Sequence, residues 1–229
     1  MNHEFRKFID DAAAIKTSGR WAAMNVKIER LAAKPGVGNE WYVQTFGSLC
    51  YQVLSEYYLL KDAYDEKRNN DASLLAWRAR NILELSVWST YFTKSRENAR
   101  RLYEDAGRDV LDILSVFEKW GQITAQSSDW IRPLTSEKQD LSQRAAAEGI
   151  ESLEGSYKRV AHAANDCGTE FFNNYSLGFK MLSKFAHPTA MQILGASDES
   201  KHALQRDCFF SQGCLFFTGA FVALESEGS

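Results

Sequence analysis

The stretch WRARNILELSVWSTYF, residues 77–92, decides the fold class of this chain. At 100° per residue its apolar side chains point in every direction, which is typical of an α-helix that is buried on all sides. Heptad-like apolar spacing recurs along the rest of the sequence, and the alternation typical of strands is nowhere convincing. Only three residues are proline, and the glycines gather at breaks between segments, which favours long helices. We therefore expect an all-α protein.

Helix-breaking residues divide the sequence into segments. The pattern places N-terminal helices within 3–33 and a long helix at 39–66. Further helices are expected at 72–93, 95–119, 136–147, 150–166, 169–186 and 199–225. Gly121 and Pro133 predict a loop at 121–135, and the spacing of Ser136 and Gln139 is that of a capping box that begins the next helix. Because no internal repeat or low-complexity linker is present, residues 1–229 are expected to form a single all-helical domain.

The bulk composition is that of an ordinary globular protein. Hydrophobic residues make up 45% of the chain and charged residues 25%, which excludes a disordered protein. The net charge of −3 provides no overall attraction to nucleic acid, so any RNA contact must use a local patch. The first residues, MNHEFRKFIDD, are charged and lack the apolar stretch of a signal peptide, which predicts a cytoplasmic location.

The four cysteines show no pattern of metal binding or cross-linking. Cys50, Cys167, Cys208 and Cys214 are far apart and form no Cys-x-x-Cys pair, which argues against a zinc ribbon and against a disulfide scaffold. No Walker loop, Rossmann fingerprint or Gly-x-Ser-x-Gly elbow occurs either. We expect reduced thiols, no metal and no cofactor.

The longest nearly uncharged segment is Cys208–Leu224. Its 17 residues fall short of a comfortable membrane span, and it contains Ser211 and Thr218. The acidic Glu225 that follows does not resemble a basic membrane anchor. We interpret the segment as a buried core helix, with a tail anchor as the alternative, and expect no membrane partner.

Arg80 and Glu84 form the first part of a candidate site. Spaced i, i+4, they lie one above the other on the central helix, and Trp77, Trp88 and Tyr91 share their face. Burying either charge alone is strongly unfavourable, so each needs a partner. Two interpretations stay open, namely a structural ion pair that fixes how helices cross, or a polar site that awaits a histidine or a bound anion.

His187 is the second part, in the stretch FKMLSKFAHPTA, residues 179–190. The apolar helical pattern ends at Ala186, and Pro188 disfavours the helical conformation for His187, so that its ring can turn away from the helix axis. Ser183 lies one turn earlier at the same edge of the helix. A histidine in a last turn can also serve only as a cap that the helix dipole favours.

Taken together, Arg-x-x-x-Glu on one helix and Tyr-x6-Leu-Ser-x3-His-Pro on another resemble an uncharacterised branch of the HEPN-like superfamily. The matching residues are Arg80, Glu84, Tyr175, Leu182, Ser183, His187 and Pro188. The resemblance covers residues 40–195 and implies a single-domain antiparallel helical bundle of about seven to eight helices, on which the N-terminal helices in 3–33 and the buried helix 199–225 pack. It also implies that the Arg/Glu helix lies beside the His-bearing helix, so that His187 meets Arg80 or Glu84.

Much of this superfamily consists of metal-independent ribonucleases or nucleotide-handling domains, often dimeric and often in defence or toxin systems. The ribonuclease motif, an arginine followed by four to six residues and a histidine, is absent here, because Arg159 precedes His162 by only three positions. The resemblance therefore implies a nucleotide or RNA site and leaves open whether the protein is an enzyme. Arg80, Glu84 and His187 are the candidate catalytic residues, and the expected ligand-binding residues are Ser183, Tyr175, Trp88 and Tyr91.

An alternative function is a non-catalytic protein–protein interaction module or homodimer in which Arg80–Glu84 is structural. RNA binding could also use the most basic stretch, which contains Lys94, Arg96, Arg100, Arg101 and Arg108. Acidic residues alternate with these cations at i, i+4 spacing, as in Glu97–Arg101 and Arg100–Glu104. This spacing favours a solvated, salt-bridged helix face over an RNA-binding stripe.

Overall fold

The protein is all-helical in the part of the chain that its structure, a computed structural model, describes. These residues are 3–33, 39–66, 72–124, 126, 128–187 and 199–227. Within these ranges there is no strand, so the predicted all-α class is confirmed. They hold nine helices, and the expected count of about seven to eight is therefore not confirmed.

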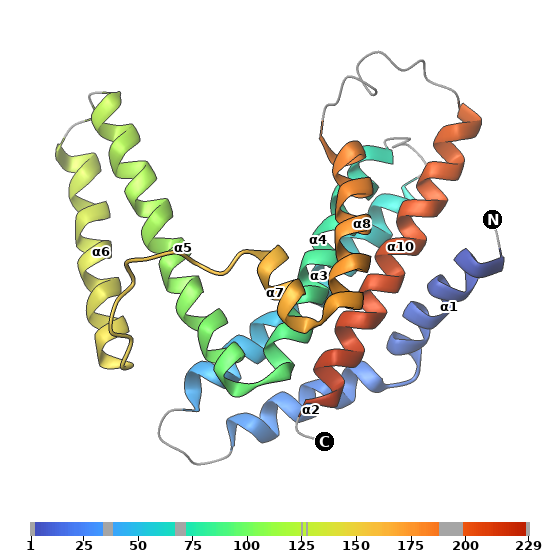
Figure 1. The fold of residues 1–229 in the computed structure, drawn as a ribbon, viewed down its shortest axis with the longest axis horizontal. Coiled ribbons are helices and arrows are strands. Elements are labelled where there is room, and N and C mark those ends of the chain that lie inside the picture. The colour runs from blue at the N-terminus through green and yellow to red at the C-terminus, as the bar shows by residue number, and fades with distance from the viewer. Residues whose placement is uncertain are drawn as a thin grey trace.

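Most of the helices lie close to where the sequence predicts them (Figure 1). Their bounds are α1 His3–Thr17, α2 Arg20–Ala32, α3 Glu40–Asp65, α4 Ala72–Lys94, α5 Arg96–Ile123, α6 Ser128–Ala147, α7 Val160–Cys167, α8 Thr169–Ala186 and α10 Glu199–Ser226. Ser95 begins α5 as a helix cap, because its Oγ accepts a hydrogen bond from the Asn98 backbone N–H at 3.1 Å.

The helix α10 lies at the centre of the main core and not on its outside. It packs against α4, α1 and α3, and α4 in turn packs against α8, α3 and α7. The ring of Phe217 stacks on Tyr57 at a centroid distance of 4.1 Å. Gly213 allows the close approach to α3, since an added Cβ would lie 2.2 Å from Leu60 Cδ2.

The same helix is the one candidate for a membrane span among the described residues. By length and composition, His202–Ser226 is long and apolar enough to cross a membrane. Half of its most apolar stretch is buried within the protein. Phe217, Phe221 and Leu224 are at most 1% exposed. This burial favours the interpretation of α10 as a core helix, since side chains packed inside the protein cannot also face lipid.

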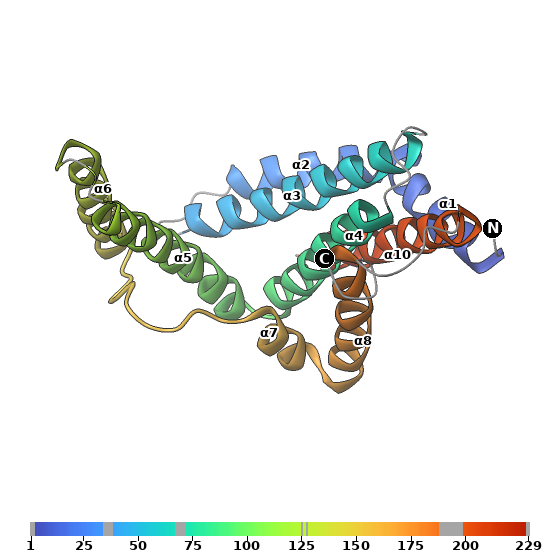
Figure 2. The same cartoon turned by 90° about the horizontal axis from the view of Figure 1, so that it is seen from above.

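The helices α5 and α6 form an arm that projects from the rest of the molecule. Figures 1 and 2 show this arm leaving α4 at one end and diverging from α8 and α10, which gives the molecule a V shape. A second small cluster holds α6 and the following segment on α5. It consists of Ala145, Ile150 and Leu153, with Tyr103, Leu111 and Leu141 packed against them.

The predicted loop at 121–135 is wrong, because α5 continues to Ile123 and α6 already begins at Ser128. Pro133 lies inside α6. The reason is a tertiary contact between the two helices of the arm. The ring of Trp130 packs on Gly121, where an added Cβ would lie 2.3 Å from it, and it meets Trp120 at 5.9 Å between ring centroids.

The predicted helix at 150–166 is also wrong over its first part, since α7 begins only at Val160. Residues before it run along α5 and are held there by polar contacts. Asp105 Oδ2 accepts from the Lys158 backbone N–H at 2.8 Å. Arg101 Nη2 donates to the Ser156 carbonyl at 2.6 Å, and Arg108 Nη2 donates to that of Ser152 at 3.3 Å. These bonds use backbone groups that a helix would keep for itself.

Candidate functional site

Arg80 and Glu84 pair on α4 as their spacing predicts. Arg80 Nε donates to Glu84 Oε1 at 3.1 Å. The two side chains retain 21% and 29% of their exposure, so the pair lies at the edge of the core. The expectation that this helix is buried on every side is therefore wrong at this face. Water reaches the pair, and a ligand can do so as well.

His187 lies against this pair. Its backbone is extended, with φ −118° and ψ 148°, and it ends α8 as the sequence predicts. Pro188 itself lies outside the described residues. Arg80 Nη1 lies 2.6 Å from His187 Nε2. Because a guanidinium can only donate, this Nε2 must accept, which places the proton of a neutral imidazole on Nδ1. The His187 side chain is exposed.

The helix α8 supplies the remaining walls of this site, which we call the Arg80 site (Arg80, Glu84, Phe179 and His187). The guanidinium carbon of Arg80 lies 4.5 Å from the centroid of the Phe179 ring, a cation–π contact that fixes the plane of the guanidinium. Phe179 in turn packs against Tyr175 at 5.5 Å between centroids. Burial, and then the nearby charge of Glu84, raise the pKa of Tyr175 to about 12.

The four expected ligand-binding residues lie on α8 and α4, at different distances from the Arg80 site. Ser183 is one turn before His187, and its Oγ is buried without a hydrogen-bond partner in the described part of the chain. Trp88 is one turn beyond Glu84 on α4, and Tyr91 is about two turns beyond it, roughly 6 and 10 Å along the helix axis. There Lys158 Nζ lies 5.4 Å from the Tyr91 ring centroid.

The basic stretch forms a salt-bridged surface. Glu104 pairs with Arg100 at 3.1 Å, and buried Asp105 pairs with Arg108 at 2.7 Å. Arg101 pairs with Asp105 at 3.1 Å and not with Glu97 as predicted. The carboxylate of Asp105 is the better partner because it already accepts from the Lys158 backbone and is screened from water. Arg100, Arg101 and Arg108 thus each form an ion pair within the protein.

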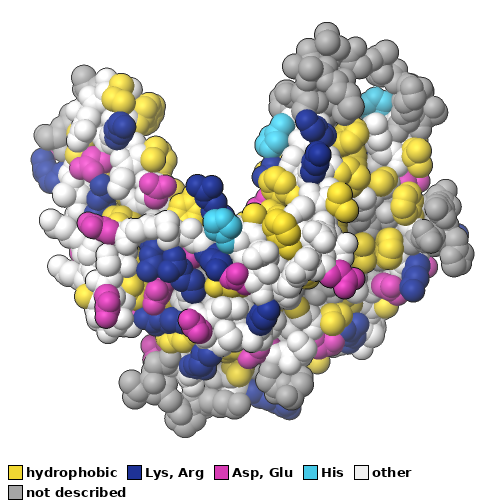
Figure 3. Space-filling model, in the orientation of Figure 1, with side chains coloured by type: hydrophobic (Ala, Val, Ile, Leu, Met, Phe, Trp, Pro, Cys, Tyr) yellow, Lys and Arg dark blue, Asp and Glu magenta, His cyan; other side chains and the backbone are white. Residues whose placement is uncertain are grey.

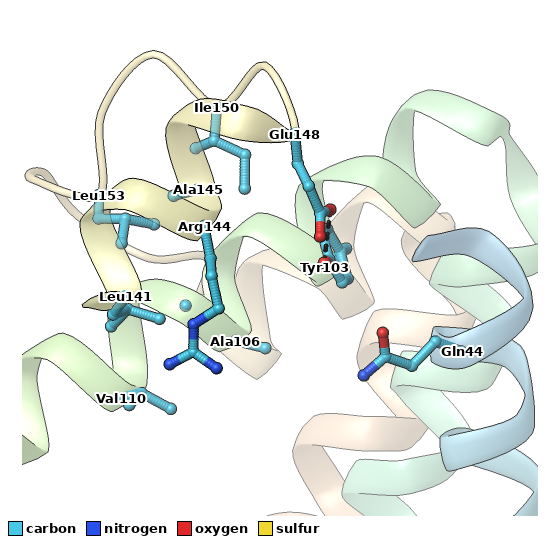
Figure 4. A pocket seen from close by; sticks show the side chains of 11 residues that line it. Gln44, Tyr103, Ala106, Val110, Leu141, Arg144, Ala145, Glu148, Ile150 and Leu153 are labelled. Carbon is cyan, nitrogen blue, oxygen red and sulfur yellow. Dashed lines mark hydrogen bonds between the residues drawn. The ribbon is translucent and has the colours of Figure 1, made fainter. Parts of the chain in front are cut away.

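A separate pocket between α3, α5, α6 and residues 148–153 had no signal in the sequence (Figure 4). Its volume is about 410 Å³. Arg144 extends into it from α6, and Gln44 faces it from α3. At its wall, Tyr103 Oη donates to Glu148 Oε2 at 2.6 Å, and burial together with this bond raises the pKa of Tyr103 to about 12. The pocket is formed by α3, α5, α6 and residues 148–153 together, so no local motif could reveal it.

A second, smaller cavity of about 220 Å³ lies between α4, α8 and α10. It is mainly apolar and is lined by Leu83, Phe171, Tyr175, Leu215 and Phe216, among others. Tyr175 therefore separates this cavity from the Arg80 site.

Metal binding finds no support in the part of the chain that is described. No group of three His, Cys, Asp or Glu side chains there is close enough to hold an ion. The four cysteines are free thiols, as expected. Burial raises the pKa of the Cys50 and Cys214 thiols to about 12, which keeps them protonated and unreactive.

Comparison with known proteins gives no relative. No family model, no curated protein and no solved structure matches the chain. The resemblance to the HEPN-like superfamily therefore rests on the sequence motif alone, and membership in it stays a prediction.

Proposed function

We propose that the protein binds a phosphate-bearing ligand, a nucleotide or RNA, at the Arg80 site. The observation that carries this proposal is the 2.6 Å contact between Arg80 Nη1 and His187 Nε2. This contact joins an arginine and a histidine, the two side chains best suited to hold a phosphate. The two residues are 107 positions apart in the sequence, and His187 is exposed to water.

The geometry leaves donors available for an anion. Arg80 uses Nε for Glu84 and Nη1 for His187, and its fork carries further N–H groups. An anion beside the pair can accept from these N–H groups and from the Nδ1–H of His187. Lys180 and Lys184 are exposed on the neighbouring turns of α8 and add positive charge. Glu84 holds the guanidinium in place through Nε.

The proposal is one of binding and not of cleavage. The sequence lacks the ribonuclease spacing of arginine and histidine, and in the structure His187 Nε2 is occupied by Arg80. A role for His187 in proton transfer would require a ligand that displaces this contact.

Equilibrium binding of ATP, AMP and a single-stranded RNA tests the proposal and distinguishes the ligand sources. Arg80→Gln removes the positive charge, whereas His187→Gln removes the imidazole but retains an acceptor for Arg80, so a structural role of residue 187 is preserved. We expect each variant to weaken binding about 10-fold to 150-fold, the loss expected for a charge-assisted hydrogen bond. Arg132→Gln, at a pair that is 74% and 80% exposed on α6, is the control for loss of one positive charge.

Two results would overturn the proposal. One is that wild-type protein binds none of the three ligands. The other is that His187→Gln binds as tightly as wild type, while Arg80→Gln lowers the melting temperature. The three residues would then be a structural tether of α8 to α4, which is the alternative role of the Arg80–Glu84 pair.

A further inference from the structure

The helix α5 carries an exposed apolar stripe on its outer half. The six residues are Val110, Ile113, Val116, Phe117, Trp120 and Ile123, and they are 42–73% exposed. Their spacing of three and four places them on one side of the helix, at positions a, d and g of a heptad. Figure 3 shows hydrophobic side chains on the side of the α5/α6 arm that faces the opening of the V. A contiguous patch of this kind marks an interaction surface.

The partner helix α6 covers a different face of α5. Leu111 packs against the small cluster with Leu141, Glu118 pairs with Lys138, and Gly121 receives the Trp130 ring. These contacts fix the arm and leave the stripe exposed, with Val110 at its edge also lining the pocket between α3, α5 and α6.

We propose that this stripe binds the same stripe of a second copy of the chain, with the two α5 helices antiparallel about a two-fold axis. In this register Ile113 lies opposite Phe117 of the second copy, and Val110 lies opposite its Trp120. Both pairs recur by symmetry, as an isologous interface requires. The inference is independent of the Arg80 site, which lies on α4 and α8.

Charge complementarity selects the antiparallel arrangement. Asp112 and Lys119 are both exposed and are seven positions apart, so they lie at the same edge of the stripe. Neither forms an ion pair with a described residue. The register that pairs Ile113 with Phe117 also places each Asp112 next to Lys119 of the other copy. In a parallel pair these residues of the two copies would lie at opposite edges of the interface and would not meet.

The area of the stripe suits a dimer. At roughly 150–250 Å² for a large apolar side chain, the exposed parts of the six residues amount to about 600 Å² per copy. Two copies would bury about 1,200 Å², the lower end of the range of specific interfaces. The stripe from Val110 to Ile123 is about 20 Å long, enough for four turns of paired helix.

Sedimentation or light scattering on the full chain tests the inference at about 50 µM, which exceeds the micromolar Kd of weak but specific interfaces. We expect a dimer for wild type and for Leu177→Glu, a control on α8 at a residue that is 70% exposed. Ile113→Glu with Val116→Glu should give a monomer with unchanged helical content by circular dichroism. A wild-type monomer overturns the proposal, and so does a dimer that survives this double substitution.

A charge exchange tests the register. Asp112→Lys and Lys119→Asp should each weaken the dimer, because each places like charges across the edge, and the double variant should restore it. Failure of the double variant to restore the dimer overturns the antiparallel register. The ligand titrations on Arg80 and His187 variants do not depend on this result.

Discussion

Asp105→Asn should detach residues 150–159 from the α5/α6 arm and destabilise the protein strongly. Asp105 is 4% exposed, and its carboxylate accepts from Arg108 Nη1 at 2.7 Å, from Arg101 Nε at 3.2 Å and from the Lys158 backbone N–H at 2.8 Å. Asparagine has nearly the same shape but carries no charge, and its amide nitrogen turns a donor toward other donors. Arg108, which is 11% exposed, would then lose the closer of its two carboxylate partners and keep only Glu104, at 3.3 Å.

The expected loss follows from the burial of this network. Removing one partner of a buried ion pair costs about 3–5 kcal/mol, whereas an exposed pair contributes about 0–1 kcal/mol. For a domain of this size, the loss corresponds to a decrease of about 6–20 °C in melting temperature.

Urea unfolding measures the change, and hydrogen exchange locates it. The backbone amide of Lys158 should lose protection first, because Asp105 is its acceptor. Asp129→Asn is the matched control, since its pair with Arg132 is exposed and should contribute less than 1 kcal/mol. A stability of Asp105→Asn within about 1 kcal/mol of wild type, with Lys158 still protected, would refute the reasoning.

Two further predictions concern the core and the arm. Phe221→Ala, at a residue with no exposed surface, should lower the free energy of unfolding by about 3–5 kcal/mol in a urea titration. Its control is Val222→Ala at the next position, which is 46% exposed and should change that free energy by less than about 1 kcal/mol. Burial and the charges of Asp105 and Asp112 raise the pKa of Asp109. The folded protein therefore favours the protonated carboxyl, and the stability that this preference provides is present at low pH and is lost as pH rises through that pKa. Asp109→Asn should therefore be more stable than wild type near pH 7, and the gain should disappear in titrations below about pH 4; a gain that does not depend on pH would contradict this cause.

The local features of this protein followed from its sequence. Apolar periodicity is a property of neighbouring residues, and it predicted the helices α1, α3, α4 and α8 within a few positions. The Arg80–Glu84 pair needs only one turn of helix, and the extended backbone of His187 needs only the proline that follows it. The pairing of His187 with Arg80 was inferred from the motif and lies beyond what periodicity alone can give.

Contacts between distant segments decided the rest. From the sequence, Pro133 is expected to interrupt a helix. In the structure it lies inside α6, and the Trp130 ring of that helix packs on Gly121 of α5. Residues 150–159 follow a helical pattern but form no helix, and Asp105 accepts a hydrogen bond from the Lys158 backbone N–H of that segment. Whether an apolar residue is core or surface is likewise not local. The stripe on α5 has the same spacing as a buried face, but its surroundings leave it exposed, because the arm diverges from the remaining helices. The sequence determined which apolar residues lie on one helix face. The tertiary structure determined which of these faces are buried, because burial depends on what packs against a face and not on the face alone.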